Sequence, residues 1–164
     1  MATTKFKGNP VSTNASIPAP GAKAPAFSLV AKDLSEKSAQ DFSGKTLVLS
    51  INPSYDTGVC QATARKFNAE LGKRSDVLVL LVSADLPFAQ KRFCEADGLE
   101  TVIPLSSFRS SFAKDYGLEL VDGPLKGLTA RAVIVIDPSG TVKHSELVPE
   151  ITNEPDYGAA LQAL

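Results

Sequence analysis

The run Val77–Ser83 (VLVLLVS) constrains the fold of this chain more than any other stretch. A continuous apolar run of this length, rich in valine, is typical of a parallel strand that is buried on both faces. Helix-like patterns flank the run, at 58–72 before it and at 87–96 after it, where the helix is expected to start near Asp85. The chain around Val77–Ser83 therefore predicts a sheet whose strands alternate with helices.

The remaining segments continue this alternation. The turn 137–140 (DPSG) predicts an antiparallel hairpin, and residues 1–20 predict a smaller hairpin ahead of the main fold. Ala62, Phe67 and Leu71 are expected on the inner face of the first long helix. The predicted strands are 27–30, 46–51, 77–83, 102–105, 132–136 and 141–147, and the predicted helices are 58–72, 87–96, 108–116 and 155–164.

This order of elements predicts an α/β fold with a mixed central sheet and flanking helices. It resembles the order of thioredoxin-like folds. Neither a G-x-G-x-x-G nor a G-x-x-x-x-G-K motif is present, so a nucleotide-binding fold is not expected. We expect one domain over residues 1–164, with residues 1–20 as an N-terminal hairpin extension.

Composition and charge narrow the classes of function. The chain has 164 residues, 43% of them hydrophobic, and a formal net charge of −1, which suits a globular domain with a core. No basic stripe indicates nucleic acid, and the apolar runs are far shorter than the ~20 residues that span a bilayer. Residues 1–10 lack the apolar core of a signal peptide. We therefore expect a cytoplasmic protein without nucleic-acid or membrane partners.

Cys60 is the first candidate for chemistry. It follows a buried strand and a turn with Pro53 and Gly58, and it stands where a helix begins. The N–H groups and the macrodipole of a helix N-terminus stabilise negative charge, which favours a reactive thiolate. Thr57 can place a hydroxyl near the sulfur, and Pro53 removes a backbone donor and stiffens the turn. Taken singly, Cys60 also fits a small buried hydrophobe and Thr57 a helix cap.

Arg131 and Cys94 complete the candidate site. Arg131 lies at the entrance to the apolar strand 132–136, where a guanidinium is costly unless it has a partner. It could stabilise both a thiolate and a developing alkoxide, although a solvated residue at a strand end is the simpler interpretation. Cys94 is the only other cysteine, so the two thiols are either inert or a reactive pair.

No cofactor or metal is expected. Two cysteines and the single His144 offer too few clustered ligands for zinc, and His144 is interpreted as structural or solvated. Four acidic residues near the C-terminus are interpreted as a solvated or helix-capping surface rather than a cation site; they are Glu146, Glu150, Glu154 and Asp156.

The spacing Pro53-x-x-x-Thr57-x-x-Cys60 matches the P-x-x-x-[TS]-x-x-C active-site signature of peroxiredoxins. Longer segments resemble the bacterial thiol peroxidases, which are atypical two-cysteine peroxiredoxins. The resemblance covers essentially the whole chain, and its specific segments are 7–11 (KGNPV), 21–27 (GAKAPAF), 83–94 (SADLPFAQKRFC), 122–132 (DGPLKGLTARA) and 146–157 (ELVPEITNEPDY).

The resemblance implies a role for each matched residue. Cys60 would be the peroxidatic nucleophile, and Cys94 the resolving cysteine of the same chain. Thr57 and Arg131 would hold the thiolate and polarise the peroxide, while Pro53 would shield the intermediate. The family also implies a homodimer that is reduced by thioredoxin and that accepts alkyl hydroperoxides alongside hydrogen peroxide.

Two features leave questions open: the residues that depart from the family pattern, and the distance expected between the two thiols. Asn52 stands where an aromatic or apolar residue is common, and Tyr55 and Gly58 also vary, which leaves substrate preference open. A disulfide needs Cα atoms roughly 4.4–6.8 Å apart, so thiols on two helices are expected to meet only after local unfolding. Closing a loop of about 35 residues constrains the unfolded chain by roughly 3–4 kcal/mol.

Three alternatives to a peroxidase remain at this point. A thioredoxin-type oxidoreductase needs C-x-x-C at the helix start, but position 57 is threonine. A redox-sensing or chaperone-like protein could use the same disulfide as a switch, without high turnover. A purely structural disulfide is the third alternative.

Overall fold

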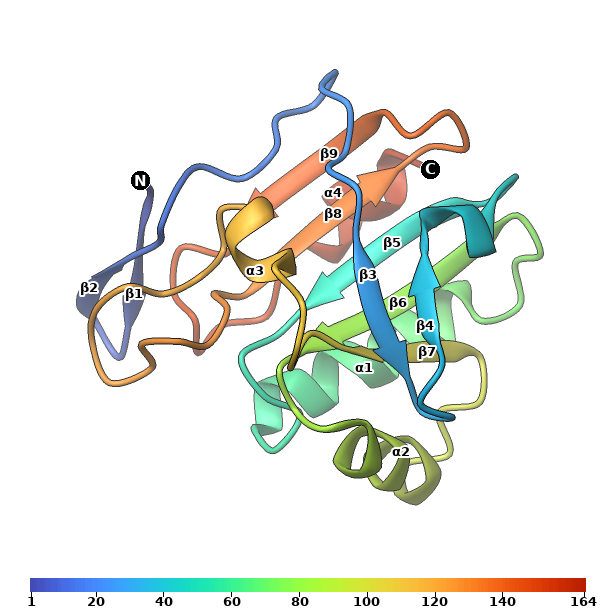
Figure 1. The fold of residues 1–164 in the computed structure, drawn as a ribbon, viewed down its shortest axis with the longest axis horizontal. Coiled ribbons are helices and arrows are strands. Elements are labelled where there is room, and N and C mark those ends of the chain that lie inside the picture. The colour runs from blue at the N-terminus through green and yellow to red at the C-terminus, as the bar shows by residue number, and fades with distance from the viewer.

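A seven-stranded mixed sheet forms the centre of the molecule (Figure 1). The computed structural model describes residues 1–164. The order of the strands across the sheet is β4-β3-β7-β6-β5-β8-β9, with β5, β6 and β7 parallel to one another. The strands are β3 (Ser28–Ala31), β4 (Glu36–Ser38), β5 (Thr46–Ile51), β6 (Val77–Ser83), β7 (Val102–Ser106), β8 (Ala132–Ile136) and β9 (Val142–Leu147).

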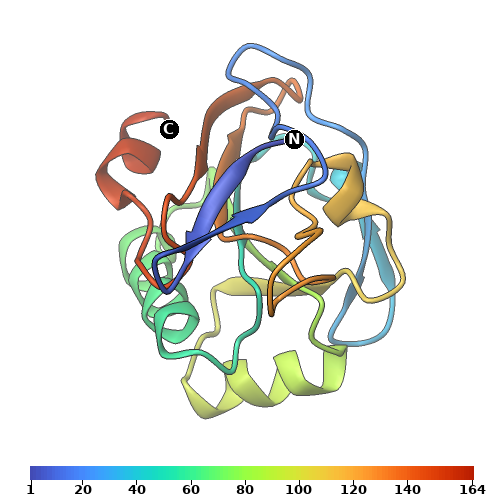
Figure 2. The same ribbon diagram turned by 90° about the vertical axis from the view of Figure 1, so that its left-hand side faces the viewer.

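Helices cover one face of this sheet more fully than the other (Figures 1 and 2). The helices α1 (Gly58–Leu71), α2 (Pro87–Ala96) and α4 (Tyr157–Gln162) pack on the same face. The short helix α3 (Phe112–Asp115) packs on the opposite face, and a 3-10 turn, η1 (Ala39–Phe42), precedes β5. None of these helices is both long enough and apolar enough to span a bilayer.

Alternation along the central strands divides the core into two clusters. In β5, Leu47, Leu49 and Ile51 belong to the cluster on the α3 side, whereas Val48 belongs to the cluster under α1. Every residue of β8 is buried, because this strand lies in the interior of the sheet with both faces covered. The expected fold class, a thioredoxin-like α/β fold with a mixed sheet, is confirmed.

The N-terminal hairpin is also confirmed. It consists of β1 (Thr3–Phe6) and β2 (Asn9–Ser12), which pair antiparallel. The backbone of Lys5 donates to the carbonyl of Pro149 and accepts from the N–H of Ile151, which fastens the hairpin to the segment that follows β9. In Figure 2 the hairpin faces the viewer, at the end of the sheet where β5 finishes.

Three local expectations were wrong. Ala62 is only half-buried, and Thr63 and Ala64 face the core in its place. The helix expected at 108–116 is reduced to Phe112–Asp115, because serine hydroxyls accept the backbone N–H groups of residues 108 and 112 and compete with helical bonds. The closing helix expected over 155–164 spans only Tyr157–Gln162, with Asp156 as its N-cap. The helix α2 spans Pro87–Ala96, as expected.

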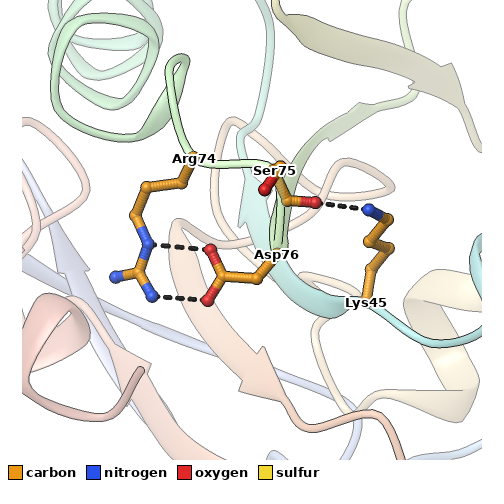
Figure 3. Close-up of polar contacts among 4 residues, drawn as sticks. All are labelled: Lys45, Arg74, Ser75 and Asp76. Carbon is orange, nitrogen blue, oxygen red and sulfur yellow. Dashed lines mark hydrogen bonds and ion pairs between the residues drawn. The ribbon is translucent and has the colours of Figure 1, made fainter.

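Polar contacts join the start of β5 to the turn before β6, at the end of the sheet opposite the hairpin (Figure 3). Arg74 donates two hydrogen bonds to Asp76, at 2.7 and 3.0 Å, and Lys45 donates to the carbonyl of Ser75. The Arg74 and Asp76 side chains are exposed, so water screens this ion pair and it contributes little to stability.

Candidate active site

Cys60 lies in the first turn of α1, beyond the end of β5. Thr57 is the N-cap of this helix, and its Oγ1 accepts a hydrogen bond from the N–H of Cys60 at 3.3 Å. The interpretation of Thr57 as a helix cap is therefore correct. Cys60 is fully buried, and Pro53 is buried in the loop between β5 and α1. The helix N-terminus thus directs its partial positive charge at a shielded sulfur.

Arg131, the residue directly before β8, contacts Cys60. Its Nη1 donates to the Cys60 Sγ at 3.1 Å and to the Asn52 Oδ1 at 2.9 Å, and its Nε donates to the carbonyl of Ile151 at 2.7 Å. Only 2% of Arg131 is exposed, so it is not a solvated residue at a strand end. The structure thus brings Cys60, Thr57 and Arg131 together, although they are up to 74 residues apart in the chain.

The charge of Arg131 has no carboxylate partner. None of the six ion pairs in the chain includes Arg131, and its hydrogen-bond acceptors are a carbonyl, an amide oxygen and a sulfur. A buried cation is costly unless an anion or good hydrogen bonds compensate it. Of the three groups that accept from Arg131, the Cys60 sulfur is the one that can carry a negative charge, as a thiolate.

A pocket of about 170 Å³ opens over this cluster. Pro53, Thr57 and Arg131 line it, which places three of the predicted site residues on one wall. Its other walls are mainly apolar and include Phe6 of the N-terminal hairpin; the remaining lining residues are Ser54, Val59, Leu125, Leu128, Ile151 and Thr152. The site can therefore accept a small polar group next to Arg131 with an apolar tail above it.

Cys94 stands apart from this cluster, in the second half of α2. Both cysteines are free thiols and both are buried. Burial raises the pKa of the Cys94 thiol to about 11, with nearby Lys32 opposing the shift only partly. Cys94 is therefore an unreactive thiol in this conformation, and it does not complete a site with Cys60 as the fold stands.

Tyr55 links the Cys60 loop to the Cys94 helix. Its ring stacks on Phe93 with the centroids 5.1 Å apart, and its hydroxyl donates to the carbonyl of Leu81. Burial raises the pKa of Tyr55 well above its ordinary value. Tyr55 is thus a neutral hydroxyl packed between the two cysteine-bearing helices.

Comparison with known proteins agrees with this geometry. Residues 19–161 match the family model described as Redoxin. A thiol peroxidase of Corynebacterium glutamicum and one of Mycobacterium tuberculosis are each 51% identical to the chain, over 100% of its length and 99% of theirs. The chain belongs to the thiol peroxidase family. This membership confirms a peroxiredoxin enzyme that carries out thiol-dependent peroxide reduction.

Solved structures of relatives support the family assignment. A peroxiredoxin-like protein from Aquifex aeolicus superposes with a TM-score of 0.92 at 41% identity, covering 99% of this chain and 95% of that one. A thiol peroxidase from Chromobacterium violaceum superposes with a TM-score of 0.88 at 22% identity, covering 98% of this chain and 93% of that one, which shows the shared fold.

Two polar residues of this thiol peroxidase site were not recognised from the sequence. Asn52 was noted only as a departure from the family pattern, yet it accepts from Arg131. The sequence carries no signal for this contact, because it depends on the register of the antiparallel β5–β8 ladder. Ile51 pairs with Ala132 there, which places the next residues, Asn52 and Arg131, opposite each other.

Asp85 is the second residue that was missed. Its carboxylate accepts from the Ser54 hydroxyl at 2.9 Å, the Tyr55 N–H at 2.8 Å and the Ser83 hydroxyl at 2.7 Å. These bonds hold the loop before Cys60 against the end of β6. The only signal in the sequence was a carboxylate directly after a buried strand, which also fits the start of a helix.

The remaining candidates have structural roles. Glu150 accepts from the N–H groups of Lys7 and Gly8 in the hairpin turn, and these bonds lower the pKa of its carboxyl. Asp156 caps α4 by accepting from the N–H of Ala159. His144 lies half-buried in β9, away from both cysteines in the sheet.

Proposed function

We propose that this thiol peroxidase reduces hydrogen peroxide and alkyl hydroperoxides through Cys60, uses Cys94 to form an intramolecular disulfide, and is recycled by thioredoxin. The observation that carries the proposal is the 3.1 Å contact between Arg131 Nη1 and Cys60 Sγ under a mainly apolar pocket. A buried cation without a carboxylate partner, set against a thiol at a helix N-terminus, suits a thiolate nucleophile.

The first step is attack of the Cys60 thiolate on the terminal peroxide oxygen. A sulfur–oxygen bond forms, the oxygen–oxygen bond breaks, and the other oxygen takes up the proton that the Cys60 thiol had released and leaves as water or an alcohol. Cys60 is oxidised to a sulfenic acid. Arg131 makes no hydrogen bond through Nη2 within the chain, so this group is available to stabilise the negative charge on the leaving oxygen. Thr57 contributes a hydroxyl at the pocket wall, and Pro53 limits access of water.

The walls of the pocket support an alkyl hydroperoxide as a substrate alongside hydrogen peroxide. Phe6, Leu125, Leu128 and Ile151 present apolar surface beside Arg131. Burial of an alkyl group gains about 0.8 kcal/mol for each CH₂ removed from water. The hydroperoxide end would then face Arg131 and Cys60.

In the second step the Cys94 sulfur attacks the sulfenic sulfur. A disulfide forms, and the hydroxyl of the sulfenic acid leaves as water with the Cys94 proton. Cys94 is buried and its pKa is raised, so we propose that the segment around it and the first turn of α1 unfold locally beforehand. The loss of the Tyr55–Phe93 stack would accompany this opening.

Recycling requires a dithiol that opens the disulfide by exchange. We propose thioredoxin for this step, because the relatives are thiol peroxidases and the disulfide would be exposed in the opened form. A reducing compartment keeps such a cycle running, which is consistent with the cytoplasmic location expected from the sequence.

A homodimer is part of the proposal. Leu86, Phe88 and Phe108 stay 45–67% exposed, and Leu86 and Phe88 stand at the start of α2. The Ser106 hydroxyl accepts a hydrogen bond from the N–H of Phe108 and donates one to the carbonyl of Asp85. These bonds place Phe108 in the same region as the start of α2. A second copy of this chain would cover these apolar side chains. Light scattering of the wild type and of Phe88→Asp tests this assignment, which a monomeric wild type would refute.

The deciding experiment is peroxide turnover with thioredoxin, thioredoxin reductase and NADPH. The proposal expects continuous NADPH oxidation by the wild type and none by Cys60→Ser. It expects Cys94→Ser to react once with peroxide and stop at the sulfenic acid, while peptide mapping of the oxidised wild type finds a 60–94 linkage. One stoichiometric oxidation of the wild type without turnover would favour the redox switch and refute the catalytic cycle.

A further inference from the structure

We propose that Asn52 is a positioning residue, whose neutral side-chain oxygen fixes the Arg131 guanidinium against Cys60 without cancelling its charge. The proposal rests on the function proposed above. The P-x-x-x-T-x-x-C signature begins at Pro53 and does not include position 52. The role of Asn52 therefore follows from its contacts in this chain.

Asn52 is itself rigidly held. It is 1% exposed, and its Nδ2 donates to the carbonyl of Ser50 at 3.2 Å. Its backbone N–H donates to Val82 at 2.9 Å, and its backbone carbonyl accepts from the Thr129 hydroxyl at 2.9 Å. All four polar groups of Asn52 therefore make hydrogen bonds: the backbone N–H, the backbone carbonyl, Nδ2 and Oδ1. These bonds hold Oδ1 in a fixed position against Arg131.

Two fixed acceptors define the plane of the guanidinium. Ile151 holds Nε at 2.7 Å and Asn52 holds Nη1 at 2.9 Å. The guanidinium is planar and rigid, so two nitrogens anchored at separate positions, Nε and Nη1, fix its orientation. The second hydrogen of Nη1 is then directed at Cys60 Sγ. Without Asn52, Arg131 would keep one anchor and could turn away from the sulfur.

The neutrality of Asn52 matters as much as its position. A carboxylate at the same place would form an ion pair with Arg131 and would repel the Cys60 thiolate. No carboxylate forms an ion pair with Arg131, so its positive charge remains available to the sulfur. An amide oxygen solvates the buried cation and leaves that charge in place.

Asn52 reaches the site through Arg131. It does not line the pocket, whereas Arg131, which donates to its Oδ1, does.

The test uses Asn52→Leu and Asn52→Asp in the full-length Cys94→Ser protein, so that Cys60 is the only thiol. The matched control is Gln90→Met, which removes a different fully buried amide, in α2. The side-chain nitrogen of Gln90 donates to the Ser83 hydroxyl at the end of β6 and to the Leu105 carbonyl in β7. Quench-flow gives the rate of Cys60 oxidation by hydrogen peroxide. Alkylation by iodoacetamide, compared at about pH 6 and about pH 10, reports the fraction of Cys60 that is thiolate.

We expect Asn52→Leu to slow oxidation about tenfold, because it removes a hydrogen bond to a charged group. We expect Asn52→Asp to slow it at least as much and to lower the ratio of the alkylation rates at about pH 6 and about pH 10 by about tenfold or more. The Gln90→Met rate should stay within about twofold of the parent, although all three variants lose some stability.

The proposal is overturned if both folded Asn52 variants match the parent, or if they slow no more than Gln90→Met does. It is also overturned if Asn52→Asp leaves the alkylation ratio unchanged. A parent protein that alkylates readily but does not react with peroxide would refute the proposed function instead. The alkylation arm would still decide the role of Asn52 in that case, because it needs no peroxide.

Discussion

Replacement of Tyr55 by phenylalanine should speed disulfide formation while leaving the first oxidation of Cys60 unchanged. The substitution keeps the ring that stacks on Phe93 and removes the hydroxyl that donates to the carbonyl of Leu81. Tyr55 is buried in the closed conformation, and the proposed opening would expose this loop to water. The lost hydrogen bond therefore penalises the closed conformation more than the open one.

The structure sets the size of the effect. A neutral hydrogen bond of this kind contributes about 0.5–1.5 kcal/mol to stability. If the Tyr55 loop must open before Cys94 reaches Cys60, the opening equilibrium shifts by about 2- to 13-fold, and the disulfide forms faster by the same factor. The contacts of Arg131 and Thr57 with Cys60 do not involve the Tyr55 hydroxyl, so the first oxidation should keep its rate.

Tyr116→Phe supplies a matched control. Tyr116 is equally buried, and its hydroxyl donates to the carbonyl of Pro25 at 2.7 Å, but it packs in the core cluster on the other face of the sheet. Both variants should lose similar stability in urea unfolding. The chain has no tryptophan, so quench-flow with mass spectrometry is the suitable assay: dimedone traps the sulfenic acid, and the disulfide shows as a loss of two hydrogens.

Two results would refute this reasoning. If Tyr55→Phe loses stability and still forms the disulfide at the wild-type rate, the Tyr55 loop does not control the opening. If Tyr116→Phe accelerates the disulfide equally, opening is a global unfolding event rather than a local one.

Four further predictions test the site and Cys94. Arg131→Met should slow oxidation of Cys60 about 10- to 100-fold, because a hydrogen bond to a charged group contributes about 1.5–3 kcal/mol. Stopped-flow competition measures this rate, and the control Arg74→Met, at an exposed arginine, should match the wild type. In Cys60→Ser, alkylation of Cys94 at about pH 9 should be about 50-fold slower in the native than in the urea-unfolded protein, because burial raises the pKa to about 11. Since that pKa is raised in the folded state, its contribution to stability should be complete below about pH 9 and should be lost as pH rises towards about 11, which urea titrations across this range would detect. Leu128→Ser should lower kcat/KM for cumene hydroperoxide about tenfold and change that for hydrogen peroxide little; an equal loss for both peroxides would contradict the alkyl pocket.

Most of the fold could be predicted from the sequence, because the spacing of apolar residues along the chain follows which side chains are buried. The strands at 46–51, 77–83 and 132–136 lie in the interior of the sheet, so their runs are continuously apolar and their bounds were predicted correctly. The strand β4 (Glu36–Ser38) was missed because it is a short, partly exposed edge strand without an apolar pattern. The helix at 108–116 was overestimated because local serine bonds to the backbone leave no trace in hydrophobic periodicity.

The candidate site was predictable to a different degree. The position of Cys60 at a helix start follows from local pattern, and so does the cap at Thr57. The contact between Arg131 and Cys60 is a tertiary one, and it needs the order of β5 and β8 in the sheet, which periodicity does not supply. Asn52 and Asp85 act through partners on other elements, so the composition of the chain and the spacing of its residues could not identify them.

Oxidation of Cys60 would itself favour opening of the closed site. Before oxidation, a Cys60 thiolate would be the only anion in contact with the buried Arg131, and a hydrogen bond with charge on both sides is about twice as strong as a neutral one. A sulfenic acid that carries its proton has no charge to offer Arg131. Oxidation would therefore weaken this contact by about 1 kcal/mol, which favours opening roughly fivefold. In the proposed cycle, the closed conformation would thus lose part of its stability at the step in which Cys94 has to approach Cys60.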